Sequence, residues 1–173
     1  MNFLMISIVV GLIALAVALM LSSAIGKAPA GTARMQEIAG YIHEGAMAFL
    51  FREYKALSAF VIVVAIVISM FLSPLTAVCF VAGAVFSVCA GYIGMTVATK
   101  ANVRTAAAAQ HGGMPEALKI AFSGGAVMGL GVVGLGIVGV AAAYMLFGNI
   151  DIVTGFGLGA SSIALFARVG GGI

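Results

Sequence analysis

Charged side chains are scarce in this sequence. Asp, Glu, Lys and Arg together make up 8% of the 173 residues, whereas 64% are hydrophobic, and the mean hydropathy is +1.26. This composition excludes a water-soluble globular domain, because one compact core cannot bury so large a share of apolar residues. The chain is therefore predicted to be a polytopic membrane protein.

Cysteine and histidine are almost absent as well. Cys79 and Cys89 fall in one apolar run at a spacing of about 15 Å along a helix axis, which excludes a disulfide between them. Neither His43 nor His111 has a second histidine at helical spacing, so we predict no metal site at either residue.

Long hydrophobic runs dominate the rest of the chain. Backbone groups in lipid must be paired internally, and a hydrocarbon layer about 30 Å thick requires about 20 residues of helix. These runs are too long for barrel strands, so we predict an all-α fold in which residues 1–173 form one transmembrane helix bundle. We expect the first run to be a retained span, since it lacks the basic start and the short apolar region of a secretory signal. Five spans are predicted, at approximately Asn2–Ile25, Leu50–Leu72, Leu75–Ala98, Leu118–Phe147 and Ile152–Ile173.

The few basic residues predict the orientation of these spans. Two loops hold nearly all of them: Lys27, Arg34, Arg52 and Lys55 in the first, and Lys100, Arg104 and Lys119 in the second. By the positive-inside rule both loops are cytosolic and the N-terminus is outside. We expect the bases of the second loop to anchor to lipid headgroups. No aromatic residues alternate with these bases, so no nucleic-acid partner is expected.

Both cytosolic loops are predicted to be largely helical. In the first loop, polar side chains recur on one helical face, which predicts that the second span extends inward as an amphipathic helix. These side chains are Glu37, Tyr41, Glu44, Arg52 and Lys55. In the second loop, an alanine run favours helix up to Gly112 and Gly113, and Pro115 suits the start of the next helix.

Four spans have no Asp, Glu, Lys or His near their centres. Transporters normally hold their ion on such an intramembrane group, so residues that bind an ion are expected elsewhere. The absence also argues against a proton-ring proteolipid, which surrounds a mid-membrane carboxylate with glycine-rich hairpins.

Glycine is abundant, with 24 residues, and its spacing predicts close helix packing. Small residues four apart let helix backbones approach one another, as at Gly125 with Gly129, Gly155 with Gly159 and Gly157 with Ser161. Residues 129–134 also match GxGxxG, but they lie inside an apolar run without a preceding strand, which excludes a dinucleotide site.

Four segments of the chain carry a family resemblance. They are EGAMAFLFREYK (44–55), KANVRTAAAA (100–109), AFSGGAVMGLGVVGLG (121–136) and, most specifically, GFGLGASSIALFARVGGG (155–172). Together they resemble the membrane-integral inorganic pyrophosphatases. The resemblance implies a homodimeric pump in the lipid bilayer with about sixteen spans per subunit. Such a pump hydrolyses magnesium pyrophosphate at the cytosolic face and exports protons or sodium. It also implies Mg²⁺ as a cofactor, K⁺ as an activator whose requirement this sequence does not decide, and a bacterial plasma membrane as the location.

The resemblance assigns roles to two residues of the last span. Arg168 is expected at the base of the active-site funnel, where it links the funnel to the ion gate, and Ser161 is expected near that gate, with Ser162 as the weaker candidate. From the residues alone, Arg168 would be an anchor at a cytosolic helix end. The family's catalytic and metal-binding residues are expected beyond Ile173, so the chain is predicted to be an amino-terminal fragment that is inactive alone. The alternative is a complete five-span scaffold or transporter subunit without catalysis.

Overall fold

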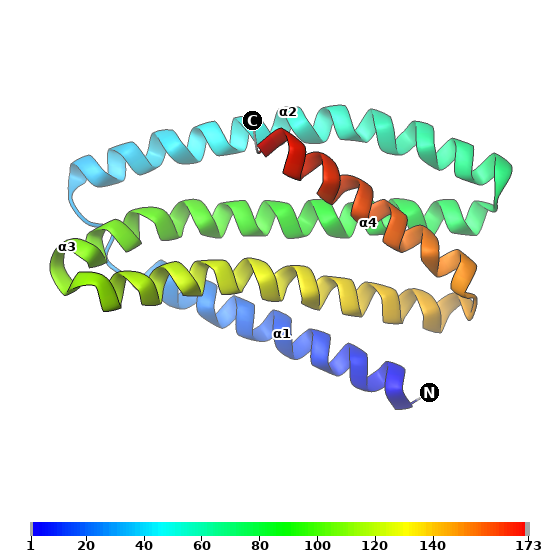
Figure 1. The fold of residues 1–173 in the computed structure, drawn as a ribbon, viewed down its shortest axis with the longest axis horizontal. Helices are drawn as coiled ribbons and strands as arrows, with labels where there is room; N and C mark the ends of the chain where they lie inside the picture. The colour runs from blue at the N-terminus through cyan, green and yellow to red at the C-terminus, as the bar shows by residue number, and fades with distance from the viewer. Residues whose placement is uncertain (1, 172–173) are drawn as a thin grey trace.

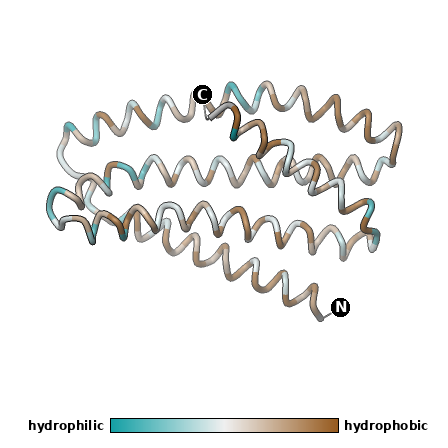
Figure 2. Tube along the Cα trace, in the orientation of Figure 1, coloured by the Kyte–Doolittle hydropathy of each residue, from teal (hydrophilic) through white to brown (hydrophobic). Residues whose placement is uncertain are grey.

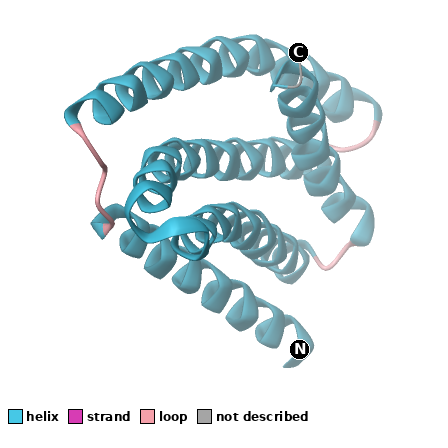
Figure 3. Ribbon diagram, turned by 60° about the vertical axis from the view of Figure 1, so that its left-hand side comes forward, coloured by secondary structure: helices cyan, strands magenta, loops and turns pink. Residues whose placement is uncertain are grey.

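The computed structural model describes residues 2–171, which form four α-helices. They are α1 (Asn2–Lys27), α2 (Ala33–Phe71), α3 (Pro74–Phe147) and α4 (Ile150–Gly171). Each is long and apolar enough to cross a membrane, and only short loops connect them, as Figure 3 shows. The predicted all-α fold is therefore confirmed.

Helix α3 contains two of the five predicted spans. Its two arms meet at Gly113, which has φ 72° and ψ −167°, a backbone conformation that is essentially restricted to glycine. Figure 1 shows the arms lying side by side and antiparallel, so the chain makes five passes along the bundle. Gly113 and Pro115 thus end one arm and begin the next as the sequence predicts. The end of the fifth predicted span, Ile173, lies outside the described residues.

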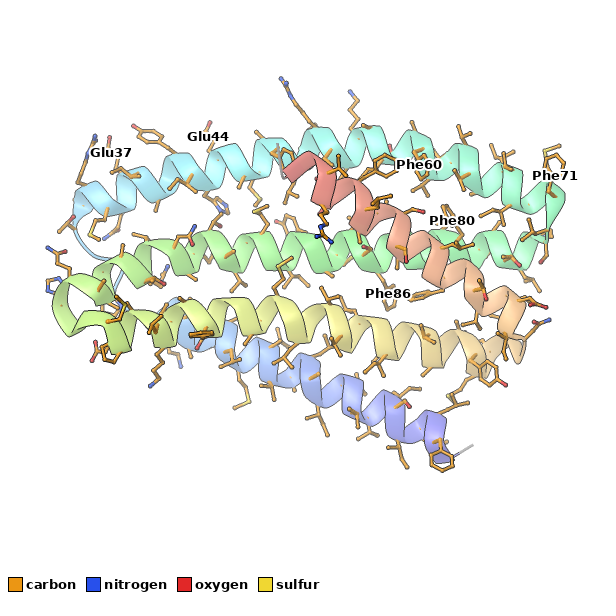
Figure 4. The ribbon with its side chains drawn as sticks, in the orientation of Figure 1. Glu37, Glu44, Phe60, Phe71, Phe80 and Phe86 are labelled. Carbon is orange, nitrogen blue, oxygen red and sulfur yellow. The ribbon has the colours of Figure 1, made fainter. Side chains whose placement is uncertain are left out.

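Helix α2 begins well before the predicted second span. Thr32 caps its first turn by accepting a hydrogen bond from the Met35 amide at 3.3 Å, and the helix then continues to Phe71. All five predicted polar-face residues are exposed. Figure 4 shows two of them, Glu37 and Glu44, projecting outward from α2. This confirms that the helix begins before the span and exposes these polar residues, whereas its cytosolic location stays a prediction.

The connections at the opposite end of the bundle are tight because their residues cap helices. Ser73 accepts hydrogen bonds from the amides of Leu75 and Thr76, and Pro74 occupies the first turn of α3, where its missing N–H costs nothing. Gly148 ends α3 in the left-handed conformation, with φ 61°, which glycine adopts without strain. These caps hold α2, α3 and α4 as close antiparallel neighbours.

Arg104 ties α1 to α3. Its guanidinium donates hydrogen bonds to the carbonyl oxygens of Ala28 at 3.1 Å and Gly26 at 3.3 Å, which lie at the C-terminal end of α1. Carbonyl groups there lack helical partners, and the helix dipole favours a cation. Arg104 therefore caps α1, a role that the sequence did not predict, and headgroup anchoring of the second-loop bases stays a prediction.

The outer surface of the bundle is largely apolar. Large side chains such as Leu19, Met70 and Phe71 are more than 70% exposed, and Figure 2 shows hydrophobic residues along most of every helix, with hydrophilic ones concentrated near the turns. Such a surface is stable only against lipid or further apolar protein. Many of the buried positions, by contrast, carry alanine or glycine, so the helix backbones lie close together.

Candidate functional site

A cavity of about 710 Å³ lies between α2, both arms of α3 and α4. Its walls are mostly apolar, formed by side chains such as Phe86, Met128 and Ile163. Few polar side chains line it: Glu53, Tyr54, Ser87, Ser161 and Arg168. Each of these polar side chains is therefore set among mostly apolar neighbours.

Glycines on α3 and α4 allow the backbones of these two helices to come close together beside the cavity. A Cβ atom at Gly159 would overlap the carbonyl oxygen of Phe80, and one at Gly155 would overlap that of Thr76. On the α3 side, a Cβ at Gly83 would overlap the carbonyl oxygen of Phe156. The three residues Gly83, Gly155 and Gly159 are called the glycine seam below. Figure 4 shows Phe80 and Phe86 near the place where α4 crosses α3.

The predicted close packing is thus confirmed for only one glycine pair within the described residues. A Cβ at Gly125, Gly129 or Gly157 would meet nothing within 4 Å of the described chain. Close packing at those positions stays a prediction for contacts with other polypeptide.

The cavity brings the two predicted site residues together. Arg168 and Ser161 both line it, and their spacing of about two helical turns places them on one face of α4 about 10 Å apart along the axis. Both residues are exposed. Ser162 differs, since its hydroxyl donates a 2.7 Å hydrogen bond to the Leu158 carbonyl of its own helix and it is not among the lining residues. Ser161 therefore lines the cavity, whereas Ser162 bonds to its own helix.

Glu53 is a site residue that sequence reasoning missed. It belongs to α2, between the exposed Arg52 and Lys55, but it lines the cavity. Its neighbour Tyr54 also faces inward and donates a 3.2 Å hydrogen bond to the Val88 carbonyl of α3. Successive residues of a helix are rotated by about 100°, so the sequence pattern itself indicated that Glu53 points away from Arg52 and Lys55. The polar-face assignment passed over it.

A contact between His43 and Thr99 also joins α2 to the first arm of α3. Nδ1 of His43 lies 3.0 Å from Oγ1 of Thr99, and that hydroxyl itself donates to the Met95 carbonyl at 3.0 Å. This hydrogen bond links side chains of two helices, so His43 stabilises the packing of α2 on α3.

Residues for holding a divalent metal do not gather in this part of the protein. Within residues 2–171, no three His, Cys, Asp or Glu side chains come together in a way that could hold a metal ion. Among the described residues that line the cavity, Glu53 is the one with a carboxylate. Mg²⁺ binding, which takes oxygen ligands from carboxylates and water, does not fit the cavity residues of this chain.

Comparison with known proteins identifies relatives of the whole chain. A candidate K(+)-stimulated pyrophosphate-energized sodium pump of Clostridium tetani is 62% identical over 173 residues, which cover 99% of this chain and 26% of the relative. A K(+)-insensitive pyrophosphate-energized proton pump of Methanosarcina mazei is 48% identical over 94% of this chain and 24% of its own length. A K(+)-insensitive pyrophosphate-energized proton pump of Moorella thermoacetica is 45% identical, with coverage of 94% and 25%. The chain thus spans about a quarter of the length of these relatives.

A family model, that of the inorganic H+ pyrophosphatases, matches residues 12–173. This match includes the cavity residues on α2, α3 and α4. Together with the apolar helices, the relatives show that this is an integral membrane protein. The chain belongs to the inorganic H+ pyrophosphatase family.

Proposed function

We propose that this chain is the amino-terminal part of a pump that couples hydrolysis of magnesium pyrophosphate at the cytosolic face to export of protons or sodium ions. The relatives are named as pyrophosphate-energized pumps, and this chain aligns with about a quarter of each. The pump works as a homodimer in the lipid bilayer, and a bacterial plasma membrane is the proposed location. The Mg²⁺ ligands and the residues that orient the attacking water belong to the remaining three quarters.

The role of this part is to couple the hydrolytic site to the ion path. The supporting observation is that Arg168 and Ser161 share one face of α4 and one cavity. A guanidinium carries a positive charge and attracts carboxylates. Arg168 therefore acts as a fixed positive charge whose acidic partners change during the cycle, while the Ser161 hydroxyl supplies a neutral hydrogen-bonding group along the same face.

The experiment measures hydrolysis and transport separately in the complete protein. Arg168→Ala is expected to insert normally but to lose pyrophosphate-driven ion transport in sealed vesicles. Arg52→Ala is the matched control, because Arg52 is an exposed arginine of α2 that does not line the cavity. Unchanged transport in Arg168→Ala would remove this residue from the coupling mechanism. Ser161→Ala tests the second residue in the same way, with Ser162→Ala as its control.

The alternative of a complete five-span scaffold explains less. It gives no reason for the match to pyrophosphate-energized pumps over nearly the whole chain. The coding sequence beyond residue 173 decides between the two readings: continuous coding sequence for an acidic, lysine-containing cytosolic segment supports the pump, and a stop codon there supports the scaffold.

A further inference from the structure

The carboxylate of Glu53 has no partner in the described chain. Three side-chain polar atoms of residues 2–171 are shielded from solvent without a hydrogen bond, and two of them are Oε1 and Oε2 of Glu53. A shielded carboxylate without hydrogen bonds or a counter-charge is strongly unfavourable. Residues 2–171, as arranged in this structure, supply neither a cation nor a hydrogen-bond donor to Glu53.

The nearby basic residues of α2 do not supply this charge. Arg52 and Lys55 are exposed and do not line the cavity. Among all residues that line the cavity, the charged ones are Glu53 and Arg168. They carry opposite charges, and they come from helices that cross each other.

The crossing of α2 and α4 brings these two side chains within reach. Phe60 of α2 and Phe166 of α4 pack edge to face with ring centroids 4.9 Å apart, and the two helices run in opposite directions (Figure 1). From this contact, Glu53 lies about 10 Å along α2 and Arg168 about 3 Å along α4, in the same direction. Both residues thus lie on the same side of the contact and line one cavity, and the exposed guanidinium of Arg168, at the end of a long flexible side chain, can move across it.

We propose that Glu53 is a positioning residue that supplies a counter-charge for Arg168 across this cavity. The ion pair holds the guanidinium toward α2, and its release lets Arg168 turn to another carboxylate. The pairing itself does not depend on the proposed function, whereas its use in ion coupling rests on that function. A readout that is independent of activity therefore keeps a failure of the pairing distinct from a failure of the pump assignment.

The test is a double-mutant cycle on the thermal unfolding midpoint of the complete protein in detergent. The variants are Glu53→Gln, Arg168→Gln and the double variant, with Glu44→Gln replacing Glu53→Gln in a control cycle. Glu44 is an exposed acid of α2, nine positions before Glu53 and so on the opposite side of the helix. If the charges pair, the double variant should unfold about 0.5–2 °C above the value given by adding the two single shifts, for a protein about four times as long as this chain. Additive shifts, as expected in the control cycle, would overturn the pairing.

Chemical labelling of arginine provides a second measurement that needs no Arg168 variant. Phenylglyoxal reacts with guanidinium groups, and the rate at Arg168 is measured by mass spectrometry of its peptide. Glu53→Gln should raise this rate at least about threefold, because a paired guanidinium is held and shielded. Glu53→Asp, which keeps the charge, should restore most of the protection. Equal rates in Glu53→Gln and Glu44→Gln would contradict the proposal.

Discussion

Adding one methyl group at Gly159 should push α4 away from α3. A Cβ there would overlap the Phe80 carbonyl oxygen and would lie 2.8 Å from its carbonyl carbon and 3.0 Å from the Ala84 amide nitrogen. Ordinary contact begins at 3.4 Å, and all three atoms belong to the backbone. No side chain can move aside, so the helices themselves must separate by more than about 0.5 Å. Overpacking of this kind costs about 1–3 kcal/mol.

The helix propensity of alanine opposes this cost and must be removed from the measurement. Replacing Gly by Ala inside a helix stabilises it by about 1 kcal/mol. Gly45→Ala, at an exposed position inside α2, has the same propensity term, but its Cβ would meet nothing within 4 Å of the described chain. The difference in stability between Gly45→Ala and Gly159→Ala therefore isolates the cost of close approach, which we expect to be about 1–3 kcal/mol.

Cys79 provides a local assay for this separation. It is buried in a cluster with Ala143 and Phe156 at the contact between α3 and α4, whereas Cys89 is exposed. Labelling by a membrane-permeant maleimide should become faster at Cys79 in Gly159→Ala and stay unchanged at Cys89. Equal stability of the two alanine variants, together with unchanged labelling of Cys79, would refute the role of the glycine seam.

Three further predictions concern other parts of the chain. Arg104→Ala should destabilise the complete protein by about 1–2 kcal/mol, because the carbonyl groups of Gly26 and Ala28 lose charged donors; proteolysis of the α1–α2 loop should become faster, and an unchanged rate would argue against the cap. Gly113→Ala should cost about 1–3 kcal/mol, since its φ of 72° is strained for any residue with a Cβ; a thermal midpoint equal to that of the unmodified protein would contradict this. The purified 173-residue chain should show no magnesium-dependent pyrophosphate hydrolysis, because within residues 2–171 no metal-binding group of side chains forms, and measurable phosphate release would refute the assignment of catalysis to other segments.

The helices were predictable because their signals are local. Hydrophobic run length identifies the spans, and Ser73, Pro74 and Pro115 mark helix starts by their own backbone preferences. The amphipathic part of α2 follows from the periodicity of its polar residues. The break in α3 was predictable from the local backbone preferences of Gly112 and Gly113. The sequence did not show that helical hydrogen bonding would continue close to Gly113 on both sides.

The cavity was only partly predictable because it depends on how distant segments meet. Arg168 and Ser161 were identified from a resemblance, and their shared face follows from helical spacing. Glu53 was passed over when the polar face of α2 was assigned, although helical rotation turns it away from Arg52 and Lys55. Only the cavity that it lines depends on where α3 and α4 lie. The capping role of Arg104 was not predicted, because a surface arginine and a helix-capping arginine have the same local sequence signal. Its acceptors at Gly26 and Ala28 are more than seventy residues away.

The length and continuity of α2 have a mechanical consequence. It is one continuous helix of 39 residues, about 58 Å long, and no proline interrupts it. Sharp bends in helices require proline, glycine–serine pairs, bulges or inserted groups, so its projecting end and its embedded end tilt as one rod. A force applied to the segment near Glu37 would therefore reach the level of Glu53 as a lever movement, with the Phe60–Phe166 contact near the fulcrum.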